Sequence, residues 1–268
     1  MYSTFAQKKP LVVFVCGDHE YSGEQTLPYL AAELSKNYGI ETKVLSAYPN
    51  QNAEKNIPGL EILEKADLVV FFLRWRQLPN DQLQYIEKYL KAGKPAIGLR
   101  TTSHAFNFPK GDVSENWNAF GEWAFNAPPG WGGKANHTHY GHKSSTDVRI
   151  APKARKHPIV KGVSSDFHSE SWLYKVQPDY PSGDSEWILI GKAVNPDKEA
   201  IESPVAWIGT NSFGGKIFFT TLGHPADFAI EDFQKLLVNA IHWVLGLKAP
   251  KKWKGKIDIQ VPYRGIVK

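Results

Sequence analysis

The chain has 268 residues, of which 42% are hydrophobic and 22% are charged, values ordinary for a protein that buries one large core or two small ones. The formal net charge of +5 comes from residues 247–268, which carry seven basic residues and one acidic residue, so residues 1–246 are close to neutral. This distribution argues against a nucleic-acid partner for the body. A single cysteine, Cys16, excludes an internal disulfide framework and a cysteine-cluster metal site.

The ends of the chain differ in composition from the rest. Residues 1–10 are predicted to be a flexible N-terminal segment, and the small residues within 1–7 are typical of the remnant of a trimmed secretion signal. In that case the protein is periplasmic or secreted, and otherwise it is cytoplasmic. Residues 11–246 are predicted to form one domain, followed by a basic, solvated C-terminal tail at 247–268. No apolar run in the sequence is long enough to span a membrane.

The first hundred residues alternate between apolar runs and helical patterns. Strands are predicted at residues 11–16, 41–45, 68–73 and 95–99, and helices at 25–38 and from Asn80 or Asp81 to Gly93. Continuous apolar runs are typical of parallel strands that helices bury on both faces. The short joints predict an α/β fold with a doubly wound, mainly parallel sheet and helices on both faces.

The second half of the chain begins with a long loop. Residues 101–146 lack periodicity and are rich in Gly, Pro, Trp, His and Asn, which is typical of a functional loop. Further strands are predicted at residues 148–151, 167–174, 187–194, 205–208 and 216–221. The Gly-rich turn at 211–215 predicts that the last two form an antiparallel hairpin. An amphipathic helix over 230–244 is then expected to pack on the sheet.

Polar side chains follow several predicted strands, at the edge where open α/β sheets bind ligands. The predicted substrate-binding residues are Asp18, His19, Glu20, Arg74, Arg76, Arg100, Thr101, Thr102, Ser103 and Trp172. Arg74 and Arg76 flank Trp75, so in an extended chain both guanidinium groups face one side, where they suit an oxygen-rich ligand. The alternatives are structural: Asp18 and Glu20 cap the next helix, and the arginines form ion pairs with carboxylates.

Three histidines in the long loop have metal-ligand spacing. His137, His139 and His142 are close enough in sequence for their imidazoles to reach one divalent ion, zinc or similar, with Glu170 completing the shell. The alternative is that these are ordinary hydrogen-bonding loop side chains.

Two segments resemble the class I glutamine amidotransferase-like superfamily, whose fold is flavodoxin-like. Residues 98–103 stand where that superfamily has a strand followed by a sharp elbow with the catalytic cysteine, and here Arg100 or Thr101 takes its place. Residues 221–225 resemble the strand end that carries the catalytic His-Pro pair, which places His224 in that position. Because the nucleophile is missing, the resemblance implies no glutaminase activity; Cys16 belongs to the first strand and is expected to be a small buried residue.

Most of the chain also resembles the trehalose-utilisation (ThuA-like) family. The matching segments are Gly132-Gly133 with the loop histidines, and residues 157–162, 169–174, 204–207 and 215–224. Ser169 departs from the usual aspartate before Glu170, and the loop is longer around residues 117–131.

The resemblance implies carbohydrate metabolism and a small-molecule carbohydrate substrate. We expect an enzyme acting on a sugar or keto-sugar, in which His224 is the general acid or base, Asp227 or Glu170 orients it, and His104 is its partner. A metal on the loop histidines would be an optional Lewis acid. Two alternatives stay open: a non-catalytic module that binds a sugar or a protein, and a glycoside hydrolase using two carboxylates, with or without a metal. Oligomeric state cannot be predicted from these residues.

Overall fold

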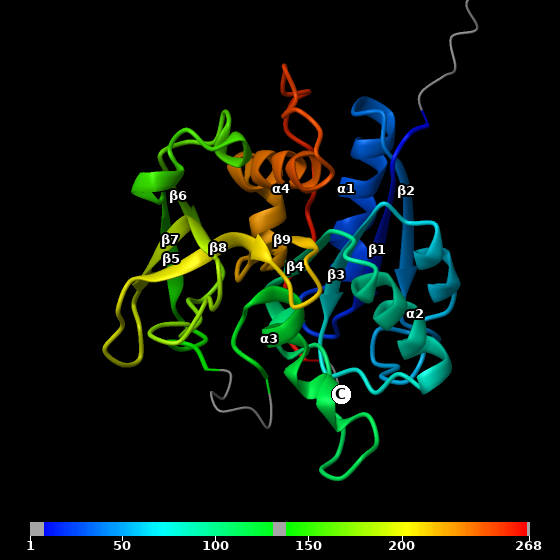
Figure 1. Ribbon diagram of the computed structural model, residues 1–268. Helices are drawn as coiled ribbons and strands as arrows, with labels where there is room; N and C mark the ends of the chain where they lie inside the picture. Colours follow the sequence, from blue (N-terminus) through cyan, green and yellow to red (C-terminus); the bar gives the residue numbers. More distant parts are fainter. Residues whose placement is uncertain (1–7, 131–137, 267–268) are drawn as a thin grey trace, which may run out of the picture.

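The structure is a computed structural model that describes residues 8–130 and 138–266. Within these residues the chain forms one nine-stranded sheet and four α-helices (Figure 1). The strands are β1 Leu11–Gly17, β2 Glu41–Ser46, β3 Leu68–Leu73, β4 Ala96–Leu99, β5 Ser145–Ile150, β6 Asp166–Ser169, β7 Glu186–Val194, β8 Ser203–Thr210 and β9 Lys216–Thr220. The helices are α1 Gly23–Asn37, α2 Asn80–Lys91, α3 Phe120–Phe125 and α4 Glu231–Val244. None of the described helices is long and apolar enough to cross a membrane.

The sheet is mixed. Its strand order is β2-β1-β3-β4-β9-β8-β7-β5-β6, with parallel pairing from β2 to β9 and antiparallel pairing from β9 to β6. The predicted hairpin of β8 and β9 is confirmed, but the sheet is not mainly parallel, since half of these pairings are antiparallel. The short connections between β7, β8 and β9 permit only antiparallel neighbours. The doubly wound description stays a prediction.

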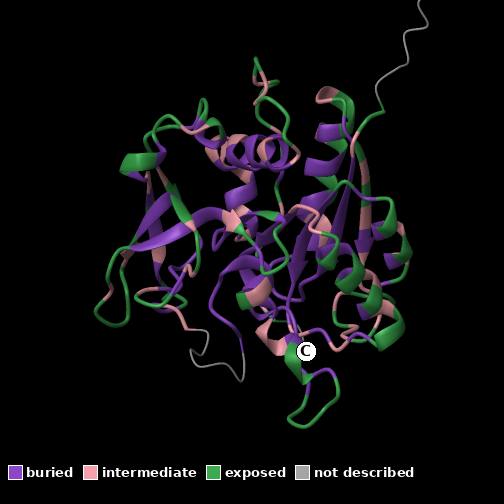
Figure 2. Cartoon of the chain, in the orientation of Figure 1, coloured by how far each residue is buried: buried purple, intermediate pink, exposed green. Residues whose placement is uncertain are grey.

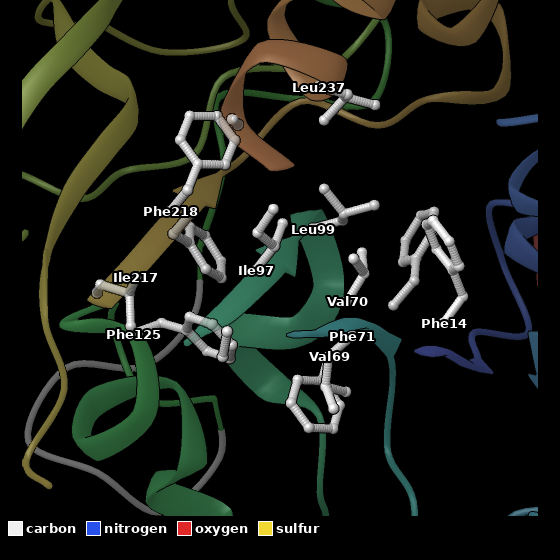
Figure 3. Packing of buried hydrophobic residues seen from close by; sticks show 14 of the residues in the cluster. Phe14, Val69, Val70, Phe71, Ile97, Leu99, Phe125, Ile217, Phe218 and Leu237 are labelled. Atoms are coloured by element: carbon white, nitrogen blue, oxygen red, sulfur yellow. The ribbon is translucent and has the colours of Figure 1, made fainter. Parts of the chain in front are cut away.

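Helices cover both faces of the parallel half, which explains its unbroken apolar strands. Along β3, Phe71 packs edge-to-face on the ring of Phe120 in α3, whereas Phe72 stacks on Phe228 on the opposite face, beside α1. All residues of β1, β3 and β4 are buried (Figure 2). Figure 3 shows the resulting core, in which Phe14, Val70 and Leu99 lie between the helical layers. Burial on this scale is the main stabilising contribution in such a domain.

Helix α2 ends as its sequence predicts. Leu83, Ile86 and Leu90 form its buried stripe. Gly93 follows with φ +67°, a left-handed conformation that terminates the helix and that other residues adopt only with strain.

The predicted strand at 167–174 is too long, since β6 ends at Ser169. The remaining residues turn away from the sheet toward the carboxyl ends of the parallel strands, where Trp172 and Tyr174 are buried.

Most of residues 247–266 are exposed, as expected for a solvated tail, but a few of them contact the domain. Ile259 is 1% exposed and belongs to the core, and the side chain of Gln234 in α4 exchanges two hydrogen bonds with the backbone of Ile257, at 2.7 and 2.8 Å. In Figure 1 this segment (red) leaves the end of α4 and runs to the opposite end of the molecule, where the C mark lies. The segment therefore reaches the edge where β1, β3 and β4 end.

Candidate functional site

Arg100 occupies the elbow at the end of β4. Its φ is +43°, a strained left-handed conformation for a non-glycine residue, and it begins the 3-10 helix Arg100–His104. Of the two residues considered for the elbow, Arg100 has the strained conformation, and Thr101 follows inside the helix. A strained turn at this point directs the following backbone across the ends of the strands.

The guanidinium of Arg100 is enclosed by aromatic rings. Its central carbon lies 4.3, 4.7 and 4.9 Å from the ring centres of Tyr21, Trp172 and Tyr174. One terminal nitrogen donates to the carbonyl of Thr221 at 2.8 Å and the other to the hydroxyl of Tyr21 at 3.1 Å. Arg100 is fully buried. The predicted nucleophile position thus holds a fixed cation, which organises three rings by cation–π contacts and hydrogen bonds.

A cavity of about 250 Å³ opens beside this ring cluster. Six predicted site residues line it: Glu20, Arg74, His104, His139, His142 and Trp172. Five further lining residues were not predicted: Tyr21, Trp75, Thr138, Tyr174 and Ile266. Since Glu20, Arg74 and His104 follow β1, β3 and β4, the cavity lies at the carboxyl ends of the parallel strands, as expected for an open α/β sheet.

Arg74 and Glu20 form a buried ion pair at the cavity wall. Nε of Arg74 lies 2.9 Å from Oε2 of Glu20, and the guanidinium stacks 3.4 Å over the ring centre of Trp75. These contacts hold a cation and a carboxylate side by side at the cavity, where oxygen atoms of a ligand can bind both.

Arg76 is not among the described residues that line the cavity, although its guanidinium and that of Arg74 both contact His19. Trp75 has φ +53°, which breaks the extended chain on which the prediction for the two arginines depended. Fully buried, Arg76 donates to the carbonyls of Arg74 at 2.7 Å and Ala53 at 3.0 Å, and its role in the described residues is structural.

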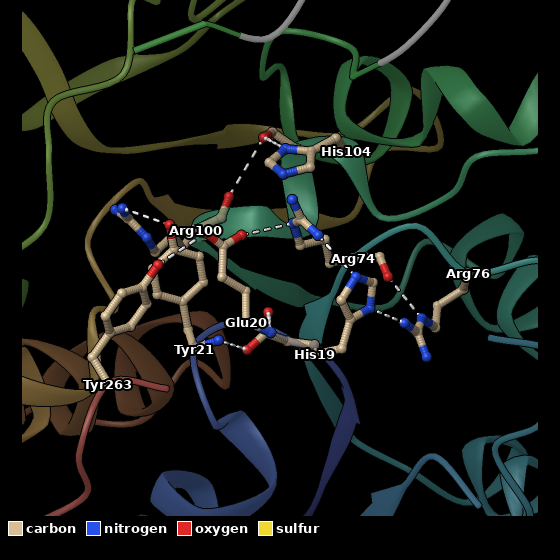
Figure 4. Close-up of polar contacts among 10 residues, drawn as sticks. His19, Glu20, Tyr21, Arg74, Arg76, Arg100, His104 and Tyr263 are labelled. Atoms are coloured by element: carbon tan, nitrogen blue, oxygen red, sulfur yellow. Dashed lines mark hydrogen bonds and ion pairs between the residues drawn. The ribbon is translucent and has the colours of Figure 1, made fainter. Parts of the chain in front are cut away.

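His19 lies between the two arginines (Figure 4), with Nε2 2.8 Å from Arg74 and Nδ1 2.5 Å from Arg76. Burial, together with the charges of Arg76 and Arg74, lowers the pKa of His19 to about 3, so the ring is neutral at pH 7.

Asp18 holds the turn after β1. Its carboxylate accepts hydrogen bonds from the backbone nitrogens of Glu20 at 3.1 Å and Tyr21 at 2.6 Å, and burial raises its pKa to about 7. Thr102 is also structural, since its hydroxyl donates to the carbonyl of Phe71 at 2.9 Å. Neither side chain is among the described residues that line the cavity. Both bear on the site indirectly, by fixing the loops that do line it.

His104 follows the elbow and reaches the cavity. Its Nδ1 lies 3.0 Å from the hydroxyl of Ser103, whose oxygen is also 3.4 Å from the carbonyl of Arg100. Gly130 packs on the other side of His104, so closely that a Cβ there would lie 2.2 Å from that of His104. The imidazole is therefore held in one orientation, as acid–base catalysis requires. Thr101 is buried in the same helix.

The loop histidines form a pair. The rings of His139 and His142 lie 4.3 Å apart, and His142 is 5.0 Å from Trp172. Nδ1 of His139 accepts from the backbone nitrogen of Gly141 at 3.1 Å, so the neutral ring carries its proton on Nε2. Burial, then the charge of His142, lowers the pKa of His139 to about 4.

The predicted third member of this metal set, His137, lies outside the described residues. Within them, no three His, Cys, Asp or Glu side chains are grouped so that they could hold a metal ion. Glu170 has an exposed side chain and does not complete such a set.

Asp227 organises the backbone rather than an imidazole. Fully buried, it accepts from the hydroxyls of Ser169 at 2.8 Å and Ser171 at 2.6 Å, and from the backbone nitrogens of Gly223 at 2.9 Å and His224 at 3.1 Å. The expected pairing of Asp227 with the His224 ring is therefore not formed. Ser169, which departs from the family's usual aspartate, supplies one of these hydroxyl donors.

His224 lies beside the cavity, but is not among its described lining residues. Its Nδ1 accepts from the backbone nitrogen of Ala226 at 3.2 Å and caps the 3-10 helix Pro225–Ala229. Burial lowers the pKa of His224 to about 4, so it is a neutral ring with its proton on Nε2. The ring of Tyr263 covers it, with centres 4.8 Å apart. The ring of Tyr263 therefore covers one side of His224.

Tyr263 is the main site residue that the sequence analysis missed. The signal was present: Ile257, Ile259, Val261 and Tyr263 alternate with polar residues or proline, the pattern of an extended segment with one buried face. The many lysines around these residues led instead to the prediction of a solvated tail.

Comparisons with known proteins agree with this architecture. A ThuA-like protein from Parabacteroides merdae superposes with a TM-score of 0.68 at 16% identity, covering 92% of this chain and 94% of the other. A ThuA-like protein from Bacteroides uniformis gives 0.60 at 16% identity, covering 91% and 95%. A search of curated proteins finds no match. The family model described as ThuA, trehalose utilisation, matches residues 12–244, and the chain therefore belongs to the ThuA family.

Proposed function

We propose that the protein is an enzyme that acts on one sugar or keto-sugar unit by acid–base chemistry in the cavity. The observation that carries this proposal is the lining itself: aromatic rings, which pack on sugar faces, together with the Arg74–Glu20 pair and the imidazoles of His104 and His139. Family membership supports a carbohydrate-related role.

The acid–base role falls to His104 in this proposal. It lines the cavity and is held by Ser103, whereas His224 caps a helix, is covered by the ring of Tyr263 and is not among the described lining residues. For a keto-sugar, His104 takes the proton from the carbon next to the carbonyl, and the electron pair moves to the carbonyl oxygen. Arg74 stabilises the resulting enolate, and Nε2 of neutral His139 donates to a hydroxyl. Isomerisation follows when the adjacent hydroxyl passes its proton to the enolate oxygen and His104 returns its proton to the former carbonyl carbon. Elimination follows when the carbonyl re-forms and a group on the next carbon leaves with its bonding electron pair and takes the proton from His104.

The experiment is a turnover screen with monosaccharides and their 3-keto derivatives, with and without a chelator. We expect turnover of at least one keto-sugar and a fall of about 10²-fold or more in His104→Gln, the usual contribution of a positioned acid or base. His168→Gln is the matched control, since that histidine is exposed on β6 and pairs with Asp147. Tight binding without turnover, unaffected by His104→Gln, would overturn the proposal and favour a binding module.

A further inference from the structure

Residues 257–266 contact the domain at three positions along the segment. Gln234 holds the backbone at Ile257, and Ile259 is buried in the core. Beyond them, Arg264 pairs with Glu24 in the first turn of α1, and its Nε donates to the hydroxyl of Ser22 at 3.2 Å. The segment is thus fixed on both sides of Tyr263.

Tyr263 is 39% exposed and lies against residues that follow different strands. Its hydroxyl donates to Oε1 of Glu20 at 3.2 Å (Figure 4), the carboxylate whose other oxygen binds Arg74. Its ring lies 4.8 Å from His224 and 5.8 Å from Trp172. The hydroxyl and the ring therefore have separate partners: one fixes the cavity carboxylate, and the other covers the histidine.

The segment also borders the cavity. Ile266 contributes to the lining, three residues beyond Tyr263. The enclosed volume of about 250 Å³ falls below the ~300–1,000 Å³ of sites for drug-sized ligands. A single sugar ring is a suitable occupant. We expect a second ring to collide with the segment at Ile266, its lining residue.

We propose that residues 257–266 are a wall of the site that limits the ligand to one sugar unit, with Tyr263 as a positioning residue for Glu20 and as the shield of His224. The ligand part rests on the proposed function, whereas the shielding of His224 does not.

The first test measures the shield without any sugar. Diethyl pyrocarbonate modifies accessible imidazoles, and peptide mass spectrometry reports the rate at His224. We expect a several-fold faster rate in Tyr263→Ala and in Arg264→Ala, and the wild-type rate in Tyr263→Phe, which keeps the ring. Arg149→Ala is the control for loss of an ion pair, because Arg149 pairs with Glu202 on the exposed surface. An unchanged rate in Tyr263→Ala, with the circular dichroism of the folded protein, would overturn the shield.

The second test separates the hydroxyl from the ring. With a keto-sugar substrate, Tyr263→Phe lowers kcat several-fold and keeps the wild-type preference for one sugar unit over two. Tyr263→Ala also shifts that preference toward the disaccharide by about tenfold, equivalent to ~1.4 kcal/mol. An unchanged preference in Tyr263→Ala refutes the wall. If no sugar binds the wild type, the proposed function and the ligand limit fail, while the labelling result still decides the shield.

Discussion

His19 makes stability depend on pH. The ring is 8% exposed, and burial, followed by the charges of Arg76 and Arg74, lowers its pKa from 6.5 to about 3. Between these values the unfolded chain binds a proton that the folded chain does not, so the free energy of unfolding falls as the pH falls through 6.5. At pH 7.5 protonation of His19 stabilises the unfolded state by almost nothing. At pH 5, which is about 1.5 units below the pKa of the unfolded state, it stabilises the unfolded state by about 2 kcal/mol.

The measurement compares urea unfolding of the wild type and His19→Gln at pH 7.5 and pH 5, followed by tryptophan fluorescence. Glutamine does not titrate, so the variant lacks this contribution, whatever its stability at pH 7.5. We expect the free energy of unfolding of the wild type, minus that of the variant, to be about 2 kcal/mol lower at pH 5 than at pH 7.5. His168→Gln is the control, because that ring is exposed. An equal difference at both pH values would show that His19 is not held neutral by its surroundings.

Three further predictions concern buried groups around the cavity. Asp227→Asn replaces an acceptor by a donor facing hydroxyl and backbone donors, so urea unfolding is expected to show a loss of about 3 kcal/mol; a loss below 1 kcal/mol would contradict this. Arg100→Met leaves the Tyr21 hydroxyl and the Thr221 carbonyl without their donor, and a loss of about 3 kcal/mol is again expected by the same measurement. Gly130→Ala places a methyl group against His104 and is expected to lower turnover about tenfold, because a misplaced catalytic group costs rate; wild-type kinetics would show that the loop adjusts freely.

The parallel half of the fold could be predicted because its strands are buried on both faces and carry an unbroken apolar signal. In the antiparallel half only the β8–β9 hairpin could be predicted, because its Gly-rich turn gives a signal. The pairing of β5 with β7 could not, since it joins residues 39 to 49 positions apart through loops without a turn signature.

The candidate site shows the same division. Polar residues after β1, β3 and β4 meet at one cavity because the carboxyl ends of parallel strands share an edge. Which of them face the cavity depends on single backbone angles. Trp75 has a positive φ between Arg74, which lines the cavity, and Arg76, which does not, and Arg100 has a positive φ at the elbow. Neither conformation can be read from residue type, because such angles are strained outside glycine.

The contact between Glu20 and Tyr263 joins residues 243 positions apart in the sequence. The segments that form the nine described strands all precede residue 257, whereas the hydroxyl that binds the cavity carboxylate follows it. Under the proposal above, the strands that build the cavity and the residue that positions its carboxylate therefore come from separate parts of the sequence.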